Sequence, residues 1–576
     1  MAKHRGIASR VSIKAKQTQA DMKDRAALIA LIAIFVFGFA LSMLLFKGMS
    51  IYGDDFAYVG QANAVLTGSF SENLNIFSLR LLMDYPLAIS LAIFGFTDLG
   101  AGAYALFSYL ISIILMFIMG RDLYGNRAGV IAALLFAIYP LSLKYSSEAI
   151  SMMPLAMFLS ISAMFFIKGK KSSSKLYFAL SGAFAFLAAL VNPLAYLYIL
   201  FFILYILVTA LVQVYRKGSL AIDYSSFAYL LGLVTLIVIF GFINFHLAAN
   251  HEPFFEFNLT SSYYSSSSMS GKSDVIFYTA PSLTFYICGY FPYTFYNCSQ
   301  FTNSISLLSP SAALSGMFSF SNMNLNDVGL FSYAYFIAGL YLLFRRDKKS
   351  YFVLAWAAFI VAYMEFGTMS LTHYFPIYKL MKFTVVAEMP ELLILGIALS
   401  KLIDSKKGRS YYIRLSLLGL ILFILFITSL PMDYYYYLFD HNTMLYPKII
   451  ARAILAHSTN LTRAQLYGSA LSPFLVNYYL GDIPMENVNV LNNGTQYGEY
   501  LPTCASIPNN TYLILPSVQA LQSINTFGPW TINESWVTDP SECGSLVMLK
   551  DVYNDSLVRG KQIYAIDYTG NLYYKP

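Results

Sequence analysis

The sequence contains few charged residues. Only 12% of its 576 residues are Asp, Glu, Lys or Arg, whereas 57% are hydrophobic; a soluble protein carries roughly 25% charged residues. A chain with so little charge has too few polar side chains to cover a water-exposed surface of this size. The scarcity of charge therefore excludes a soluble globular protein and predicts a polytopic, all-α membrane protein.

The sequence also lacks the common signatures of nucleotide and zinc enzymes. It has no glycine-rich nucleotide loop, no Walker sequence and no H-E-x-x-H. A nucleotide-dependent cytoplasmic enzyme is therefore excluded, and no nucleotide cofactor is expected. The net charge of +7 does not indicate a nucleic-acid partner, because the basic residues form short clusters between apolar runs, where orientation in the membrane explains them.

The apolar runs predict eleven transmembrane spans. The first, residues 26–45, has the length of a full span and no small-residue cleavage site, so we expect a retained helix rather than a signal peptide. The apolar stretch 86–96 is too short to cross and is interpreted as re-entrant or interfacial. The other expected spans are 102–120, 128–143, 149–167, 176–192, 194–214, 227–247, 329–344, 351–371, 384–402 and 413–431.

Two independent features orient these spans. The segments predicted to be cytoplasmic hold 24 of the 37 basic residues in a short total length. Every N-x-S/T sequon lies in a segment predicted to be outside. We therefore expect a multi-pass plasma membrane protein with a cytoplasmic N-terminus and an external C-terminus. The sequons begin at Asn258, Asn297, Asn460, Asn493, Asn509, Asn533 and Asn554.

The same pattern divides the chain into parts. Residues 1–25 form a basic cytoplasmic N-terminus, and residues 26–431 form a transmembrane domain with a first external loop at 47–101 and a long one at 248–328. Residues 432–576 have ordinary polarity and are long enough to hold their own core. A helix-like stretch at 446–457 and strand-like runs at 488–491, 512–515, 546–549 and 562–566 predict a smaller, mixed α/β external domain.

The four cysteines fall in the two long external parts. Cys288 and Cys298 lie in the long loop, and Cys504 and Cys543 lie in the tail. External thiols commonly pair, so we predict the disulfides Cys288–Cys298 and Cys504–Cys543, although four cysteines allow three connectivities and free structural cysteines are the alternative.

The first external loop begins with two adjacent carboxylates. Asp54 and Asp55 directly follow the first span, and Phe56, Val59, Ala62 and Leu66 then recur at helical spacing. The pattern predicts a short amphipathic helix in the membrane interface with the acid pair at its N-terminal end. Two interpretations stay open at this point. The acids could cap the helix and complement its dipole, or they could serve a functional site at the membrane surface.

Further polar groups are expected on the same side of the membrane. Carboxylates and cations that converge there suit a negatively charged, lipid-linked substrate, because cations hold a phosphate while a carboxylate accepts a proton or ligates a divalent metal ion. Arg80 and Lys144 could instead be snorkelling anchors, Glu148 a helix N-terminal acid, and His373 a structural residue. These candidate groups are Asp54, Asp55, Arg80, Asp84, Lys144, Glu148, His373, Lys379, Lys382 and Glu388.

Four stretches of the chain carry motifs in a definite order. They are YGDDFAYVGQANAVLTG, SLRLLMDYPLAISLAIFGFTDLGA, RDLYGNRAGVIAALLFAIYPLSLKYSSEAISMMPLAMF and LMKFTVVAEMPELLILGIALS. The motifs are an acidic first-loop motif followed by a helix ending in Gly, a basic residue followed by Pro and F-G, a cytoplasmic turn with a Pro-containing span end, and a late basic, aromatic and Pro pattern. Taken in order, they resemble the GT-C glycosyltransferases, especially the protein O-mannosyltransferase and aminoarabinose transferase branch (glycosyltransferase family 39 and relatives). The resemblance covers residues 51–166 well and 378–400 loosely.

The resemblance implies transfer of a sugar from a polyprenyl-phosphate donor to a protein, lipid or glycan acceptor at the outer face. It implies that either Asp54 or Asp55 is the catalytic base, and of the two we favour Asp55, with Asp54 as helper. It also implies that Glu148 is a second acid, although relatives carry an Asp nearer Met152 or Met153 that this chain lacks. It implies that Arg80 and Lys382 contact the lipid phosphate, and we add Lys144 and His373 as candidates. Asp54 and Asp55 are also the candidate ligands of a divalent metal ion.

Two rival classes predict other features. A transporter predicts charges within the spans or broken helices in related halves, but the clearest charge within a span is Glu365, near a span end, and no internal repeat is evident. A membrane-anchored surface protein without catalysis would leave eleven spans as mere scaffold. The oligosaccharyltransferase branch is rejected, because its Trp-Trp-Asp motif is absent and the three tryptophans are scattered.

Overall fold

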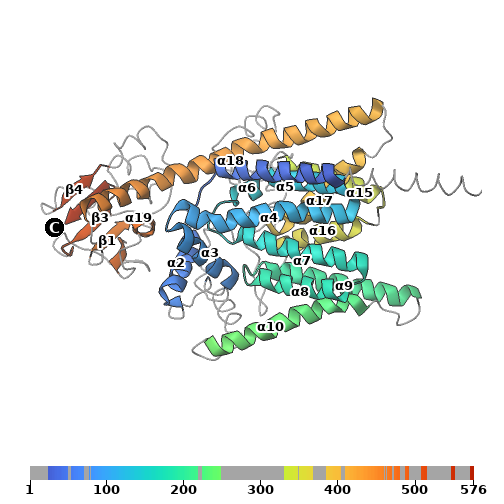
Figure 1. Ribbon diagram of the computed structural model, residues 1–576, viewed down its shortest axis with the longest axis horizontal. Helices are drawn as coiled ribbons and strands as arrows, with labels where there is room; N and C mark the ends of the chain where they lie inside the picture. Colours follow the sequence, from blue (N-terminus) through green and yellow to red (C-terminus); the bar gives the residue numbers. More distant parts are fainter. Residues whose placement is uncertain are drawn as a thin grey trace, which may run out of the picture. The chain divides into compact units, whose positions relative to one another are not determined.

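The structure is a computed structural model of the 576-residue chain (Figure 1). It divides into two compact units, each described by itself below. The first comprises residues 1–46, 67–86 and 104–434, and the second comprises residues 47–66, 87–103 and 435–576. The residues that the structure describes are 24–49, 54–70, 77, 80–217, 224–247, 330–347, 349–366, 385–403, 409–458, 461, 464–469, 472–480, 487–491, 507–515, 546–551 and 571–575.

The first unit is a bundle of helices. It opens with the helix Asp24–Leu44 and contains the larger part of each helix named in the next sentence except α3, which the boundary between the units divides. The helices are α3 (Leu81–Phe94), α4 (Asp98–Tyr124), α5 (Asn126–Ala137), α6 (Pro140–Lys144), α7 (Met152–Ser172), α8 (Lys175–Ala189), α9 (Ala195–Lys217), α10 (Ala228–Leu247), α15 (Phe331–Phe344), α16 (Tyr351–Phe366), α17 (Val385–Leu402) and α18 (Arg409–His457). The helix α2 (Asp54–Thr67), apart from its last residue, and the helix α19 (Ser472–Leu480) belong to the second unit.

Helix α17 is enclosed by its neighbours along nearly all of its length. It packs against α5, α7, α15 and α16, and every residue from Val385 to Ser400 is buried. Small residues let the backbones approach, since a Cβ atom on Gly396 of α17 would lie 3.1 Å from the Cβ atom of Ala132 on α5. Aromatic rings fill the space beside it, where Phe166 of α7 meets Phe202 of α9 with ring centroids 4.3 Å apart.

The number of membrane crossings differs from the sequence prediction. A helix occupies each of the eleven predicted spans, but six helices within the described part are both long and apolar enough to cross a membrane. The others are shorter or, like α17, carry several charged residues. Eleven spans are therefore not confirmed. The six are Asp24–Leu44, Asp98–Tyr124, Met152–Ser172, Ala195–Tyr215, Ser225–Ile243 and Tyr411–Leu430.

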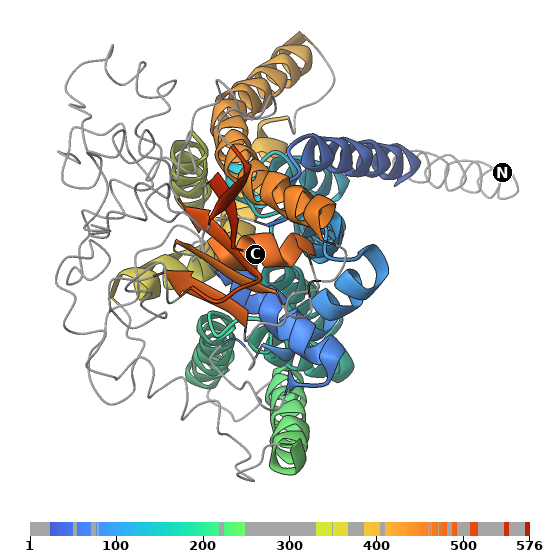
Figure 2. The same ribbon diagram turned by 90° about the vertical axis from the view of Figure 1, so that its left-hand side faces the viewer.

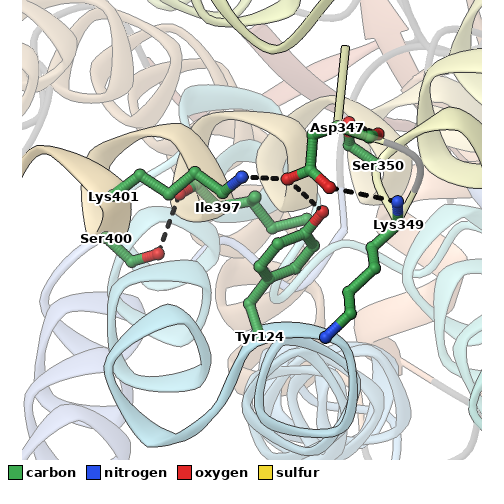
Figure 3. Close-up of polar contacts among 7 residues, drawn as sticks. All are labelled: Tyr124, Asp347, Lys349, Ser350, Ile397, Ser400 and Lys401. Carbon is green, nitrogen blue, oxygen red and sulfur yellow. Dashed lines mark hydrogen bonds and ion pairs between the residues drawn. The ribbon is translucent and has the colours of Figure 1, made fainter. Parts of the chain in front are cut away.

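Segments predicted to be cytoplasmic meet at one end of this bundle. Asp347, in the turn between α15 and α16, accepts a hydrogen bond of 2.7 Å from the hydroxyl of Tyr124 at the end of α4. The same carboxylate forms an ion pair with Lys401 in the last turn of α17 (Figure 3). Lys171 of α7 also pairs with Asp122 of α4 at 3.3 Å. These helix ends therefore lie together, as the alternation of predicted loops requires, while the side of the membrane that they face remains a prediction.

The second unit contains a five-stranded sheet. Its strands are β1 (Gln465–Ser469), β2 (Val488–Leu491), β3 (Thr511–Leu515), β4 (Val547–Lys550) and β5 (Asn571–Lys575), in the order β2-β1-β3-β5-β4 (Figure 2). β1 is parallel to β2 and β3, whereas β5 is antiparallel to β3 and β4. The last turns of α18 and the helix α19 (Ser472–Leu480) pack their apolar side chains, including Ile450 and Val476, against it.

This sheet largely confirms the mixed α/β character predicted for the tail. The predicted runs 488–491, 512–515 and 546–549 coincide with β2, β3 and β4 to within a residue at either end, and the predicted helix 446–457 is the end of α18. The run 562–566 lies outside the described residues. β1, β5 and α19 were not predicted. The predicted domain boundaries remain predictions.

Candidate functional site

Asp54 and Asp55 open the helix α2 (Asp54–Thr67), as the sequence predicts. The helix stops before Gly68, which has φ +77°, the left-handed conformation that glycine adopts without strain at a helix C-terminus. The buried stripe of α2 is formed by Asp55, Tyr58, Val59 and Ala62 at helical spacing. The two carboxylates therefore differ in environment: Asp55 is fully buried, whereas Asp54 is half-buried.

The predicted apolar face of α2 is wrong in part. Val59 and Ala62 are buried, but Phe56 is only half-buried and Leu66 is 42% exposed. The reason is that α2 packs through the face that carries Tyr58 and Asp55, and this face also buries a carboxylate. A pattern of apolar residues alone does not reveal such a polar residue on a buried face.

In the first unit, Arg80 directly precedes the helix α3. Its guanidinium lies over the ring of Phe77, 5.0 Å from the centroid. One helical turn later, Asp84 is fully buried, and neither of its carboxylate oxygens has a hydrogen-bond partner within the described residues. Burial raises the pKa of Asp84 to about 8, and the charge of Arg80 opposes this rise. The sequence placed Asp84 among the polar groups of the loop but did not assign it a role.

Lys144 and Glu148 lie in a segment expected to be an exposed loop. The structure instead folds it into the short helix α6 followed by a turn, and both side chains are buried, with 7% and 1% exposed. The ammonium group of Lys144 lies 5.4 Å from the ring centroid of Tyr145. Such burial disfavours a snorkelling role for Lys144, because a snorkelling lysine keeps its charged end in water.

The first turns of α17 carry a pair of acids that the sequence analysis did not recognise as a pair. Glu388 and Glu391 are spaced three residues apart and are both buried. Ser142 of α6 donates a hydrogen bond of 3.1 Å to one oxygen of Glu388, and the other oxygen has no partner among the described residues. Two acids in the apolar run VVAEMPELLILGIALS were the available signal, since ionisable residues in apolar helices are rare and commonly functional.

Hydrogen bonds tie the surrounding segments to the same end of the first unit. Asn192, between α8 and α9, donates to Ser151 at 2.8 Å, and the backbone N–H of Leu82 in α3 donates to the carbonyl of Leu190. The latter bond satisfies one of the donors that a helix leaves unpaired in its first turn. This end of the bundle therefore collects Arg80, Asp84, Lys144, Glu148 and the acids of α17, at the opposite end of α17 from Lys401.

Some predicted groups lie outside the described residues. These are His373, Lys379, Lys382 and the four cysteines, so their roles and both disulfides remain predictions. Within the part of the chain that the structure describes, no three His, Cys, Asp or Glu side chains gather as a metal site. Asp54 and Asp55 therefore lack a third such ligand there.

Comparison with known proteins gives a consistent result. Residues 81–245 match the family model described as dolichyl-phosphate-mannose-protein mannosyltransferase. No curated protein matches the sequence.

Among solved structures, ArnT from Cupriavidus metallidurans bound to undecaprenyl phosphate is 14% identical, with a TM-score of 0.50 over 88% of this chain and 96% of that chain. The same ArnT in the apo state is 13% identical, with a TM-score of 0.48 over 81% and 86%.

The Archaeoglobus fulgidus oligosaccharyltransferase in complex with Zn and sulfate is 13% identical, with a TM-score of 0.46 over 79% of this chain. This chain spans 63% of the length of that oligosaccharyltransferase. At such identities a structural likeness shows the fold alone, and the lipid-bound ArnT structure, with its nearly complete coverage, carries that likeness. The chain is therefore a multi-pass membrane protein with the GT-C fold, similar to the mannosyltransferase and aminoarabinose transferase branch of that fold.

Proposed function

We propose that the protein is a glycosyltransferase that moves a sugar, a hexose such as mannose, from a polyprenyl-phosphate donor to a protein, lipid or glycan acceptor. The match of residues 81–245 to the mannosyltransferase family model carries this proposal. The likeness to ArnT, whose structure holds undecaprenyl phosphate, supports the class of carrier. The enzyme works at the outer face of the plasma membrane, with its N-terminus in the cytoplasm and its C-terminal domain outside.

Asp55 is the catalytic base in this proposal. Its carboxylate takes the proton from the acceptor hydroxyl as the acceptor oxygen bonds to the anomeric carbon of the sugar. The bond between that carbon and the phosphate oxygen breaks with inversion, and the electron pair leaves with the polyprenyl phosphate. The full burial of Asp55 supports this assignment, because an enclosed carboxylate can act on the acceptor where bulk water is excluded, whereas Asp54 is half-exposed. Asp54 is its helper, and Glu148 is the second acid.

Cations stabilise the leaving phosphate. Arg80 and Lys144 supply them from the first unit, with Lys382 and His373 as further candidates. Arg80 stands at the start of a helix only 14 residues long, about 21 Å, which is too short to cross a hydrocarbon core of about 30 Å. A cation at such a position suits the carrier phosphate, because the polyprenyl chain stays in the bilayer and holds the phosphate at the depth of the lipid headgroups.

A divalent metal ion would be held by Asp54 and Asp55 and would help to neutralise the phosphate. The oligosaccharyltransferase structure that holds Zn makes such an ion plausible in this fold. The described residues add no third His, Cys, Asp or Glu ligand to the acid pair, so they do not fit a complete site. No step of the proposed reaction uses a metal ion.

Sugar transfer in purified membranes tests this function. The native chain, Asp55→Asn and Asp54→Asn are given labelled polyprenyl-phosphate hexose after equal insertion has been verified. We expect Asp55→Asn to lose transfer by about 100-fold or more, the usual range for removal of a general base, and Asp54→Asn to lose less. Asp122→Asn is the control, because it alters only the ion pair with Lys171 near the C-terminal end of α4. A native chain that neither transfers sugar nor binds the carrier would contradict the function. Full activity in both variants would contradict only the role of the acid pair.

A further inference from the structure

Asp84 is a buried carboxyl group that the proposed reaction does not use. The buried face of α3 carries the apolar residues Met83, Leu87, Ala88 and Leu91 together with Asp84 and Ser90, and the Ser90 hydroxyl donates a hydrogen bond to the carbonyl of Gly100. The opposite face of α3 exposes large apolar side chains, with Ile89 60% and Ile93 67% exposed. Asp84 therefore points into the protein, where it has no access to bulk water.

The carboxyl group is also without hydrogen bonds. Both of its oxygens are enclosed, and neither has a hydrogen-bond partner among the described residues. An ionised carboxylate in such a place is strongly disfavoured, and the usual outcome is that the group takes up a proton instead. In agreement, burial raises the pKa of Asp84 to about 8 against the opposing effect of Arg80. At neutral pH the group is a neutral acid.

Arg80 is the charged residue within reach of this acid. The backbone N–H of Asp84 donates to the carbonyl of Arg80 at 3.0 Å, which places the two residues one helical turn apart. Residues four apart in a helix are neighbours on one face, and an arginine and a carboxylate at this spacing form an ion pair readily. The pair is not formed within the described structure, where the guanidinium of Arg80 lies over Phe77.

We propose that Asp84 is a positioning residue that acts through Arg80: its protonated form leaves the guanidinium to the phosphate of the polyprenyl carrier, and its ionised form draws the guanidinium away. The proposal rests on the proposed function, because it takes Arg80 as a phosphate ligand. The proposal gives a reason for the acid Asp84 to lie beside Arg80, the residue proposed to bind the carrier phosphate. An arginine beside Asp84 can interact with the phosphate or with the ionised acid, and protonation of Asp84 decides between these two anions.

The sign of the pH dependence follows from this exchange. Well below pH 8 Asp84 holds its proton and leaves Arg80 to the phosphate. Above pH 8 ionised Asp84 competes with the phosphate for Arg80, so the affinity falls by up to about tenfold per pH unit. Among the described residues, Tyr104 of α4 is another titratable group near this turn, and its hydroxyl donates to the carbonyl of Leu82 at 2.7 Å.

Binding of polyprenyl phosphate to the full chain in nanodiscs tests the proposal between pH 7.5 and 9.5. In this window a phosphate monoester, with a second pKa of about 6, is fully ionised, and a lysine, with a pKa of about 10.4, is still charged. We expect the native chain to lose affinity above pH 8. Asp84→Asn, which keeps the shape and mimics the neutral acid, should bind as the native chain does at pH 7.5 and keep that affinity to pH 9.5.

Arg80→Met is the matched variant at the other end of the pair. It should bind weakly at every pH, and Asp84→Asn in the same chain should change nothing further. A second readout needs no ligand: the infrared difference between the native chain and Asp84→Asn should contain the carbonyl band of one protonated carboxylic acid at pH 7, and this difference band should be lost above pH 8. The difference is needed because other buried acids, such as Glu388 and Glu391, contribute bands to both chains.

Four outcomes would overturn the proposal or its basis. If Asp84→Asn keeps the native loss of affinity above pH 8, or if the native chain shows no such loss, Asp84 does not control Arg80. If the infrared difference band is missing at pH 7, Asp84 is not the neutral acid that we infer. A native chain that binds no carrier at any pH overturns the proposed function as well, and this failure is distinguishable because it precedes any comparison of variants.

Discussion

The hydroxyl group of Ser142 on α6 donates a hydrogen bond of 3.1 Å to Glu388 on α17, and both side chains are fully buried. This bond joins the five-residue helix α6, which carries Lys144, to α17, whose residues from Val385 to Ser400 are all buried. A buried acid on such a helix retains its place only with a partner, because an unsatisfied polar group in the interior is costly. The bond therefore fixes α6 at the end of the bundle where the cations gather.

The first prediction concerns this bond. Ser142→Ala leaves Glu388 without the donor that it has in the described structure, and we expect a loss of about 1–3 kcal/mol in the free energy of unfolding. The double variant Ser142→Ala, Glu388→Leu should lose less than the sum of the two single changes, since both polar partners are then removed. Unfolding of the four chains in lipid nanodiscs measures this coupling.

Ser112→Ala is the control for that series, because the hydroxyl of Ser112 donates only to the carbonyl of Ser108 in its own helix. It should change the free energy of unfolding little. Strict additivity of Ser142→Ala and Glu388→Leu would contradict an energetic link between α6 and α17.

The second prediction concerns the close approach of α8 and α10. A Cβ atom on Gly182 would overlap the backbone carbonyl oxygen of Tyr229, and one on Gly232 would overlap that of Ala179. Neither oxygen can move aside without moving its helix. We expect Gly182→Ala to destabilise the fold by about 3 kcal/mol or more, which is the upper range for overpacking.

The matched change is Gly419→Ala in α18, where a Cβ atom would meet nothing within 4 Å. Because alanine favours a helix over glycine by about 1 kcal/mol, this variant should be as stable as the native chain or more so. The measurement is the thermal unfolding midpoint of both variants. Equal effects of the two substitutions would show that the α8–α10 contact is looser than the structure indicates.

The third prediction concerns orientation. Lys349 is exposed beside Asp347 at the end of the bundle where Tyr124 and Lys401 meet (Figure 3). We expect this end to face the cytoplasm, because basic residues are retained there during insertion. A cysteine at Lys349 should therefore react with a membrane-impermeant maleimide only after the cells have been permeabilised.

Met548→Cys in β4 is the control, since this side chain is 53% exposed and lies in the part predicted to be outside. It should react on intact cells. Each added cysteine is scored as the increment over the parent chain, which has four cysteines of its own. The reverse pattern would invert the predicted topology and move the proposed site to the cytoplasmic face.

The sequence predicted where the helices lie better than it predicted how many of them are long enough to cross the membrane. Apolar runs predicted a helix at each expected span, because a long apolar run must satisfy its backbone internally. It did not anticipate that α5, with 12 residues, or α8, with 15, would be too short to cross alone. The apolar run that contains α5 continues past the end of this helix, because the following turn and α6 are also buried. A hydropathy pattern cannot distinguish one long helix from a short helix followed by a buried turn.

The candidate site divides in the same way. The sequence predicts a role for Asp55, because an acid at a predicted helix start beside a span is conspicuous, and this role stays a prediction. The sequence did not point to a role for Asp84 or Glu391. Both lie on helix faces whose other residues are apolar, and which face is buried depends on packing partners distant in sequence. β1 and β5 were missed for a related reason, since their pairing with β3 joins segments roughly 45 and 60 residues away.

The last prediction concerns Asp98, which anchors three segments of the second unit. Its carboxylate forms an ion pair with Lys448 of α18 at 2.5 Å and accepts a hydrogen bond of 2.8 Å from the hydroxyl of Tyr479 on α19. Burial, followed by the charge of Asp98, raises the pKa of Tyr479 well above its usual value, so this phenol remains a donor throughout the neutral and alkaline range.

These two contacts should differ in strength. Asp98→Asn keeps an acceptor for Tyr479 and loses only the partly exposed ion pair, so we expect a cost below about 1 kcal/mol. Asp98→Ala removes the acceptor as well and leaves the enclosed hydroxyl of Tyr479 unsatisfied, at an expected cost of about 1–3 kcal/mol. Because Tyr479→Phe removes the same bond from the other side, it should add little to Asp98→Ala. Hydrogen exchange of the α19 amides in the native chain and in these variants measures how strongly each substitution destabilises α19. If the α19 amides exchange as fast in Asp98→Asn as in Asp98→Ala, the ion pair with Lys448 holds α19 in place, and the hydrogen bond from Tyr479 does not.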